Sequence, residues 1–292
     1  MRTILIRMQP VKSPAIPRTA PLQEPRKRGP AALACTLVLS LALWGCASLP
    51  PSDELVLRKP VVLLGEVHDN AAQHALRLRA FETLLASGAR PALALEQFDR
   101  NRQADIDQAL ARMPRPDADA LIAAAGGSKG WHWPHYRPFI ALALQHGLPI
   151  VAANVPSSEA RVVMRDGLAA TGFDPQVPEA VLQAHTRHIL EGHCGQLNAQ
   201  TAARMALAQV ARDQYMARVL QIHASRGVVL LAGNGHVRSD LGAPRWLDAE
   251  TRQRSEAIGV LEAGDDDTAY DRWVHTAAQA RPDPCATMAR KP

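Results

Sequence analysis

Five short apolar runs set the strongest limit on how this chain can fold. Each lasts four or five residues, is nearly free of charge and lies close to a glycine or proline. The runs are Val61–Leu64, Ala92–Leu95, Ile150–Ala153, Val228–Ala232 and Ala257–Leu261. Continuous apolar strands separated by helical stretches are typical of a parallel sheet that is covered on both faces. We therefore predict an α/β fold with a mostly parallel central sheet flanked by helices.

Helical periodicity fills most of the chain between those runs. The expected helices are Ala71–Ala86, Asn101–Met113, Pro138–Gln145, Ser157–Leu168, Glu179–Glu191 and Asn198–Ser225. With the runs, they indicate one α/β domain over residues 61–277, which carries a helical insertion at about residues 101–225. We expect Tyr270–Thr276 to be an edge strand of this domain, followed by a C-terminal tail at 278–292.

The basic character of the chain comes from its first 30 residues. They hold seven of the 33 basic side chains and one of the 28 acidic ones, which leaves 26 basic against 27 acidic side chains in the rest. Nucleic-acid binding requires a basic surface on the folded domain. The composition therefore argues against a nucleic-acid partner, although the net charge of the whole chain is +5.

A targeting signal precedes the predicted domain. A basic triplet at 26–28 comes before an apolar run at 31–43, which has the length of a secretory signal and is short for a membrane span. The sequence LWGCAS that follows resembles a bacterial lipobox, whose cysteine, here Cys46, carries the lipid. We expect residues 1–45 to be a lipoprotein signal peptide and 46–60 a tether. The protein would then be a membrane-anchored lipoprotein of the bacterial cell envelope that faces the periplasm, or one of the outer membrane. The alternative is an uncleaved anchor with a cysteine here by chance.

Two cysteines remain beyond the predicted tether. Cys194 and Cys285 could pair in an oxidising compartment, but Cys194 also lies in a histidine-rich stretch and could serve another role. The sequence leaves both alternatives open. No CxxC spacing occurs, which argues against a structural zinc site.

Polar side chains follow four of the predicted strands at the point where each strand ends. They are Glu66, His68, Glu96, Asn154, Asn234, His236 and Arg238. In open α/β sheets, ligands bind beyond the carboxyl ends of the strands, so we expect these side chains at one rim. Two histidines, each three residues after a glycine, with a carboxylate between them, suit a divalent metal or an acid–base pair.

Each of these residues also has a purely structural interpretation. Glu96 could cap the next helix, and Asp69 or Asn70 could cap the helix that starts at Ala71. A single histidine at a strand end is more often a hydrogen-bonded core residue than a ligand. The functional interpretation therefore depends on the set as a whole.

Six segments in order resemble one family, the ChaN-like proteins of the Tiki/TraB/erythromycin-esterase superfamily. They are GEVHDN, ALEQFDR, the segment from Gly130 to Pro138, VAANVP, ARDQYMA and AGNGHVRSDLGAP. The resemblance covers roughly residues 60–277. It implies an iron-regulated lipoprotein that binds haem, with a tyrosine as the iron ligand and with haem held at the interface of a homodimer.

The chain offers several candidate contacts for haem, which needs an axial ligand, an apolar pocket and cations for its propionates. Tyr136 follows two tryptophans and two histidines, while Tyr215 lies three residues from Arg212 and could face a second copy of the chain. Either tyrosine could instead pack in the core. At the rim, candidate cofactor contacts are Asn154, Asn234 and Arg238. Three more candidate ligands are His185, His188 and His193.

The superfamily also implies a different function. It includes metal-dependent peptidases and esterases, whose site combines two GxxH motifs with a glutamate. Here His68, Glu96 and His236 match that pattern and would bind a divalent ion such as zinc, manganese or cobalt, while Glu66 would accept a proton from metal-bound water. A third alternative is an interaction lipoprotein whose site is vestigial. We favour a haem-binding lipoprotein of iron acquisition, with the hydrolase as the main alternative.

Overall fold

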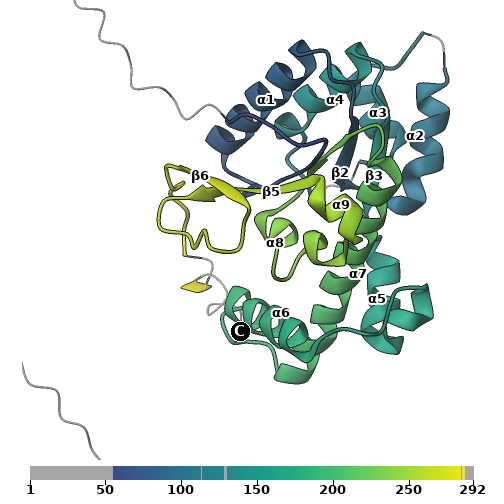
Figure 1. Cartoon of the computed structure of the whole chain (residues 1–292). Helices are drawn as coiled ribbons and strands as arrows, with labels where there is room; N and C mark the ends of the chain where they lie inside the picture. The colour runs from purple at the N-terminus through teal and green to yellow at the C-terminus, as the bar shows by residue number, and fades with distance from the viewer. Residues whose placement is uncertain (1–54, 113, 128–129, 284, 287–292) are drawn as a thin grey trace, which may run out of the picture. The chain divides into compact units, whose positions relative to one another are not determined.

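Six strands in the described part of the chain form one parallel sheet (Figure 1). They are β1 (Val61–Leu64), β2 (Ala92–Asp99), β3 (Ile150–Asn154), β4 (Val228–Leu231), β5 (Ser255–Glu262) and β6 (Arg272–Thr276). Their order across the sheet is β3-β2-β4-β1-β5-β6, and every neighbouring pair is parallel. The predicted α/β fold is confirmed, and the sheet is parallel throughout.

This computed structural model describes residues 55–112, 114–127, 130–283 and 285–286. The predicted signal peptide, Cys46 and the first part of the predicted tether lie outside these residues. The described residues belong to one compact unit, Leu49–Pro292. Among the helices of this described part, none combines the length and the apolar character that crossing a membrane requires.

The predicted strands all appear, and β2 and β5 exceed their expected ranges by the most. β2 continues to Asp99, because Glu96 and Gln97 are buried and the pairing with β3 resumes at Asp99 after an irregularity. β5 is buried at all eight positions, and two of these are glutamates. An apolar run predicts only the uncharged centre of this strand, so the sequence did not show where the strand begins and ends. β6 lies at the sheet edge, as predicted for the segment before Thr276.

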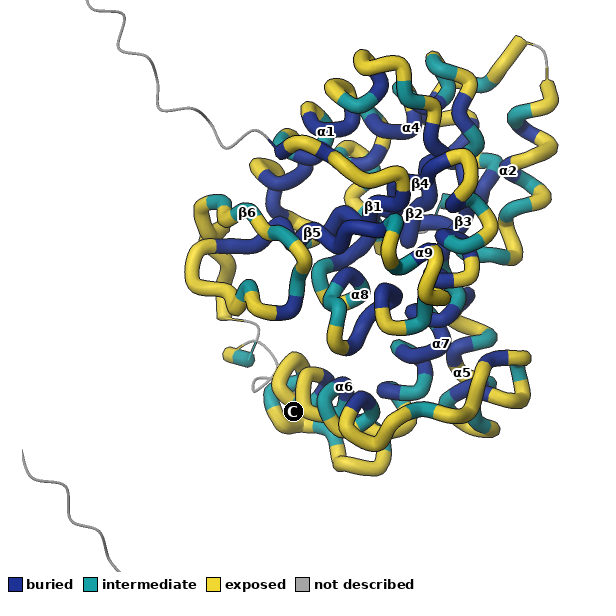
Figure 2. Tube along the Cα trace, in the orientation of Figure 1, coloured by how far each residue is buried: buried dark blue, intermediate teal, exposed yellow. Residues whose placement is uncertain are grey.

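Four helices cover one face of the sheet: α1 (Ala71–Ala86), α2 (Gln103–Leu110), α3 (Ala118–Ala124) and α4 (Arg137–Gln145). Alternate strand residues such as Val62 and Leu64 join Phe81 and Phe139 in this layer of the core. The buried strands lie between exposed helix surfaces (Figure 2). The short helix α3 was not expected from the sequence, because its seven residues make only about two helical turns.

The opposite face is covered mainly by α7 (Ala199–His223), α8 (Asn234–Val237) and a short 3-10 turn. Helices α5 (Ser157–Asp166) and α6 (Glu179–Gly192) pack on α7 beyond the sheet. The span of the expected insertion therefore contains β3 and sheet-covering helices as well as this outer helical part. Helix α9 is Ala249–Gln253, and the 3-10 helices are η1 (Arg100–Arg102), η2 (Trp133–His135), η3 (Leu168–Thr171) and η4 (Ala243–Trp246).

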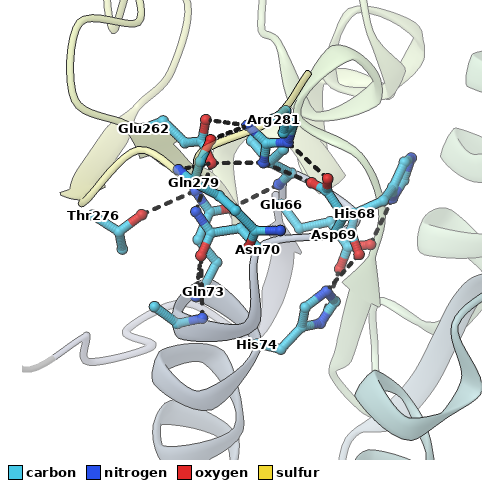
Figure 3. A network of polar contacts seen from close by, with 12 residues as sticks. Glu66, His68, Asp69, Asn70, Gln73, His74, Glu262, Thr276, Gln279 and Arg281 are labelled. Atoms are coloured by element: carbon cyan, nitrogen blue, oxygen red, sulfur yellow. Dashed lines mark hydrogen bonds and ion pairs between the residues drawn. The ribbon is translucent and has the colours of Figure 1, made fainter. Parts of the chain in front are cut away.

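The C-terminal tail is joined to the domain at two points. Cys194 and Cys285 form a disulfide. Of the two alternatives that the sequence left open for Cys194, the structure therefore shows pairing. Arg281 donates hydrogen bonds to Asp69 and Glu262, 2.6 to 2.7 Å away (Figure 3). The tail thus links the loop after β1 to the loop between α6 and α7. At the other end, the expected tether includes Leu55 and Leu57, which are buried in the core.

Candidate functional site

The loops after β1 and β4 border a cavity of about 490 Å³. Helix α6 and one residue of α7 complete its lining. Five histidines line it: His68, His185, His188, His193 and His236. Apolar side chains and one cation also line it: Val67, Ile189, Leu241 and Arg238. This cavity lies at the carboxyl ends of the strands, where the sequence predicts a site.

Glu66 is the buried centre of one wall. Its side chain is fully buried, and one oxygen accepts hydrogen bonds from the His68 ring and the Tyr136 hydroxyl. The other oxygen pairs with the buried guanidinium of Arg77. Burial lowers the pKa of Arg77 to about 9, so the guanidinium still carries its charge at neutral pH. Glu66 is therefore held as a carboxylate by three donors.

His68 lies at the edge of the cavity, and one of its two ring nitrogens forms a hydrogen bond. Nδ1 lies 2.7 Å from Oε1 of Glu66, and 48% of the side chain is exposed. The ring of Trp131 contacts the imidazole edge-on, with 4.9 Å between centroids. In the described residues, Nε2 of His68 forms no hydrogen bond. Figure 3 shows Glu66 and His68 beside the start of α1.

His236 lies between two carboxylates. Its Nδ1 is 2.6 Å from Oδ1 of Asp213, and its Nε2 is 3.6 Å from Oε1 of Glu96. Burial by itself would lower the pKa of His236, but the charges of Asp213 and Glu96 outweigh burial and raise it to about 9. The ring is therefore held between the carboxylates of Asp213 and Glu96.

Two glycines beside these histidines are required by close contacts. A Cβ atom at Gly65 would lie 2.1 Å from Oδ1 of Asn234, and one at Gly233 would lie 2.9 Å from Cε1 of His68. The Gly233 amide donates a hydrogen bond of 2.7 Å to Oε2 of Glu96. The GxxH spacing therefore reflects tight packing of the two loops against each other.

Helix α6 supplies the opposite side of the lining with three histidines. His185 is buried, with Nε2 3.7 Å from Oδ2 of Asp213. His188 is exposed, one helical turn further on. His193 lies at the C-terminal cap of α6, where Nδ1 is 2.7 Å from the carbonyl oxygen of Ile189. The disulfide at Cys194 anchors the chain directly after His193.

The other expected rim residues have mainly structural contacts. Asn234 bonds through its side chain to the backbone of Val260 on β5, and Asn154 accepts a hydrogen bond from the amide that follows it. Arg238 lines the cavity and pairs with Asp240. The expected helix cap is also present, since Asn70 accepts hydrogen bonds from the amides of Ala72 and Gln73.

The tyrosines that were candidate iron ligands do not line the cavity. Tyr136 is completely buried and donates to Glu66. The ring of Tyr215 lies 5.2 Å from the guanidinium of Arg100 and borders a separate pocket with Ile222. Its neighbour on the helix, Arg212, donates a hydrogen bond to Gln209.

The sequence patterns did not identify two residues of the site. Arg77 and Asp213 are fully buried, each in the middle of a helix, and each supports a carboxylate or histidine of the rim. A signal existed for Asp213, because the apolar residues Val210 and Ala217 lie three before and four after it, on the same helical face. A charge on an apolar helical face is buried with a partner or not at all.

A family model matches most of the α/β domain. Residues 54–247 match the family described as haem-binding uptake, Tiki superfamily, ChaN. The chain belongs to this ChaN family. No curated protein sequence matches it.

Two solved structures show different degrees of similarity to this chain. ChaN of Campylobacter jejuni, solved with cofacially bound haem, is 23% identical, covers 73% of this chain and 86% of its own, and has a TM-score of 0.61. An erythromycin esterase mutant, EreC, in its open conformation is 14% identical over 70% of this chain and 71% of its own, with a TM-score of 0.42. The first likeness supports the fold.

The expected divalent-metal site is not supported. Within the residues that the structure describes, no group of three or more His, Cys, Asp or Glu side chains is arranged to hold a metal ion. His68 and Glu96 lie beside Gly233, and His236 lies between the carboxylates of Asp213 and Glu96. What the ChaN cavity offers is a set of imidazoles, apolar walls and one guanidinium.

Proposed function

We propose that this protein binds haem in the cavity lined by five histidines. Membership of a haem-binding family supports this proposal, and the main observation behind it is the set of residues that line the cavity. A haem site needs an axial ligand, apolar contacts for the macrocycle and a cation for a propionate. The cavity offers exposed imidazoles, the side chains of Ile189 and Leu241, and the guanidinium of Arg238. When bound, haem would supply the iron and four of its nitrogen ligands, so a single protein imidazole completes the minimum set.

A larger groove elsewhere has apolar side chains and guanidinium groups but no imidazole. It measures about 620 Å³, lies between α6 and α7, and is lined by residues such as Leu182, Arg187 and Leu207, with no histidine. Ligand pockets of drug-sized molecules measure about 300–1,000 Å³, so both volumes are suitable and chemistry must decide. The histidine-lined cavity is therefore the proposed haem site.

A haemin titration tests this proposal. Residues 49–292, the compact unit, are titrated with haemin while absorbance is followed, and metal content is measured by mass spectrometry. We expect a saturable Soret shift near one haem per chain. Gly235→Trp should abolish it, because a side chain at Gly235 meets no atom within 4 Å and would fill the cavity. Gln183→Trp, in the α6–α7 groove, is the matched control and should bind normally.

The opposite results would overturn the proposal. No Soret shift, with stoichiometric zinc, manganese or cobalt that is lost in His68→Ala, would favour the hydrolase alternative. Loss of haem in Gln183→Trp but not in Gly235→Trp would move the site to the groove.

We also propose that the protein is a lipoprotein of the cell envelope that serves haem or iron acquisition. The lipobox-like sequence at Cys46 supports this, and the disulfide between Cys194 and Cys285 suits an oxidising compartment. Expression of the full chain with radiolabelled palmitate should label it, and Cys46→Ser should remove the label. Cys35→Ser, in the expected signal peptide, is the control and should keep it.

A further inference from the structure

We propose that the end of the sheet opposite the histidine-lined cavity docks on the anionic phospholipid surface of a membrane. This docking face consists of the turns that lead into β1 to β5, at residues 55–60, 87–91, 146–149, 224–227 and Arg254. The inference goes beyond haem binding. It rests on the proposed lipid anchor only for the distance between the domain and the membrane.

Backbone hydrogen bonds join the five turns of the docking face. They measure 2.8 to 3.3 Å and run from Val228 to Pro60, from Ala92 to Gly227, from Leu93 to Pro149 and from Val61 to Arg254. Because the strands are all parallel, these turns lie together at the amino ends of the strands. Charges on the five turns therefore act on a ligand as one surface.

Every aspartate and glutamate is excluded from these turns, whereas five cations are present. The cations are Arg58, Lys59, Arg90, Arg226 and Arg254. The chain after its first 30 residues holds 26 basic and 27 acidic side chains, so the excess of positive charge is local to this face. A surface of one sign attracts the opposite sign over a Debye length, about 8–10 Å at physiological salt.

Most of these cations lack a carboxylate partner. Within the part of the chain that the structure describes, four of them are exposed and form no ion pair: Arg58, Lys59, Arg90 and Arg226. Lys59 and Arg90 donate hydrogen bonds to backbone carbonyl oxygens. Arg254 lies 4.0 Å from Glu250, whose side chain is 86% exposed. The positive charge of the docking face is therefore open to an anionic ligand.

Two guanidinium groups border a pocket on this face. Arg115 and Arg226 both line a cavity of about 320 Å³ beside the turn before β3. A Cβ atom at Gly147 would lie 3.3 Å from Nη1 of Arg115, which places this guanidinium on that turn. Leu110 and Leu148 supply apolar walls. Guanidinium groups bind phosphate oxygens through parallel N–H donors, so the pocket suits the phosphate of a lipid headgroup.

An apolar side chain lies beside the cations. Ile222 is 67% exposed and is one helical turn before Arg226, near the end of α7. Cations next to exposed aliphatic side chains suit the boundary between lipid headgroups and acyl chains. This combination favours a bilayer over a purely polar anion.

The proposed lipid anchor would hold the docking face close to a bilayer. The described chain begins at Leu55, three residues before Arg58, and Cys46 lies nine residues before Leu55. Nine residues span at most about 32 Å when fully extended. A lipid on Cys46 would make docking intramolecular, so that a modest attraction between the face and the headgroups is sufficient.

Docking by this face sets the orientation of the domain. The histidine-lined cavity lies at the carboxyl ends of the strands whose amino ends form the docking face. The cavity would therefore open away from the membrane, toward the aqueous compartment from which a ligand arrives.

Sedimentation with lipid vesicles tests the docking. Residues 49–292 lack Cys46, so the result does not depend on lipidation. The protein should bind vesicles of phosphatidylcholine and phosphatidylglycerol in equal amounts, and it should not bind vesicles of phosphatidylcholine alone. Binding should weaken as salt rises from about 0.05 M to about 0.5 M. Arg58→Glu/Arg226→Glu should weaken it by at least about 25-fold, since each cation near an anionic bilayer contributes about fivefold.

The matched control makes the same charge change on the side of the cavity. Arg187 and Arg204 are exposed on α6 and α7, and α6 also supplies histidines to the cavity. Arg187→Glu/Arg204→Glu should bind anionic vesicles as wild type does. Equal weakening by both double variants would show that only the net charge matters, and it would overturn the docking face.

Other results would also overturn the proposal. They are a lack of binding to the anionic vesicles and equal binding to the neutral ones. A short DNA duplex that displaces the protein from vesicles at the same phosphate concentration would assign the face to nucleic acid instead. Haemin titration and palmitate labelling are independent of these measurements, so a failure of docking is distinguishable from a failure of haem binding or of the lipid anchor.

Discussion

The hydroxyl of Tyr136 donates a hydrogen bond to the carboxylate of Glu66, and both side chains are completely buried. Burial raises the pKa of Tyr136, so the phenol stays neutral and serves as a donor. Tyr136, which the sequence suggested as an iron ligand, thus donates to Glu66, and Glu66 in turn forms a hydrogen bond with His68. Its contribution is to the stability and geometry of the rim.

Tyr136→Phe should destabilise the protein by about 1.5–3 kcal/mol, because it removes a buried hydrogen bond to a charged group. Haem binding should persist. Denaturant unfolding of residues 49–292 measures the first effect and haemin titration the second. Tyr215→Phe, which changes a half-buried phenol, should alter stability by less than about 0.5 kcal/mol. A haem ligand at Tyr136 would reverse this pattern, with haem lost and stability preserved.

Arg77 should be among the costliest positions to change. Its guanidinium is 0% exposed and neutralises Glu66 in the core. Arg77→Met would leave an unpaired buried carboxylate, at a cost of about 3–5 kcal/mol in the free energy of unfolding. Glu66→Gln added to Arg77→Met should recover part of that loss, since the buried charge is then gone.

An exposed arginine gives the matched control for this prediction. Arg137 pairs with Asp119, and both side chains are more than half exposed. Arg137→Met should therefore cost less than about 1 kcal/mol. Equal losses in Arg77→Met and Arg137→Met would show that Arg77 and Glu66 are not a buried ion pair.

The sequence predicted the parts of this protein that depend on periodicity. The apolar runs located five strands and the segment before Thr276 located the edge strand, because burial on both faces excludes charge from a strand centre. The rim at Glu66, His68 and His236 followed from strand ends. What periodicity could not show is which side chains turn toward one another.

The tyrosines and the buried partners illustrate that limit. Tyr136 lies beside two tryptophans in the sequence, yet its position beneath Glu66 depends on how η2 packs on the start of α1. Asp213 lies 23 residues before His236, and only the packing of α7 under the β4 loop brings them within 2.6 Å. Such contacts join segments that are far apart in the chain, so spacing alone does not reveal them.

The disulfide should contribute strongly to stability. Cys194 and Cys285 are 91 residues apart, and closing so long a loop restricts the unfolded chain by about 4–5 kcal/mol in the chain-entropy account, with measured losses of about 2–5 kcal/mol. Residues 49–292 contain no other cysteine. A reducing agent should therefore lower the unfolding free energy of this unit, and the double variant Cys194→Ser/Cys285→Ser should be equally unstable and insensitive to the agent. Continued sensitivity in the double variant would refute this account.

Stability should fall on the alkaline side of neutrality because of His236. The ordinary histidine pKa is 6.5 and that of folded His236 is about 9, so its stabilising charge is fully present below pH 6.5 and is lost as the pH rises through 9. The shift corresponds to a loss on the order of 3 kcal/mol.

On the acid side, burial lowers the pKa of His74 to about 4, so protonation of the unfolded chain reduces stability as the pH falls from 6.5 toward 4. Unfolding free energies measured from pH 5 to 10 should thus peak near 6.5. His236→Gln should remove the fall in stability above neutral pH. The control His275→Gln, at an exposed position, should leave that fall in place. If the fall persists in His236→Gln, the group that loses its proton there is not His236.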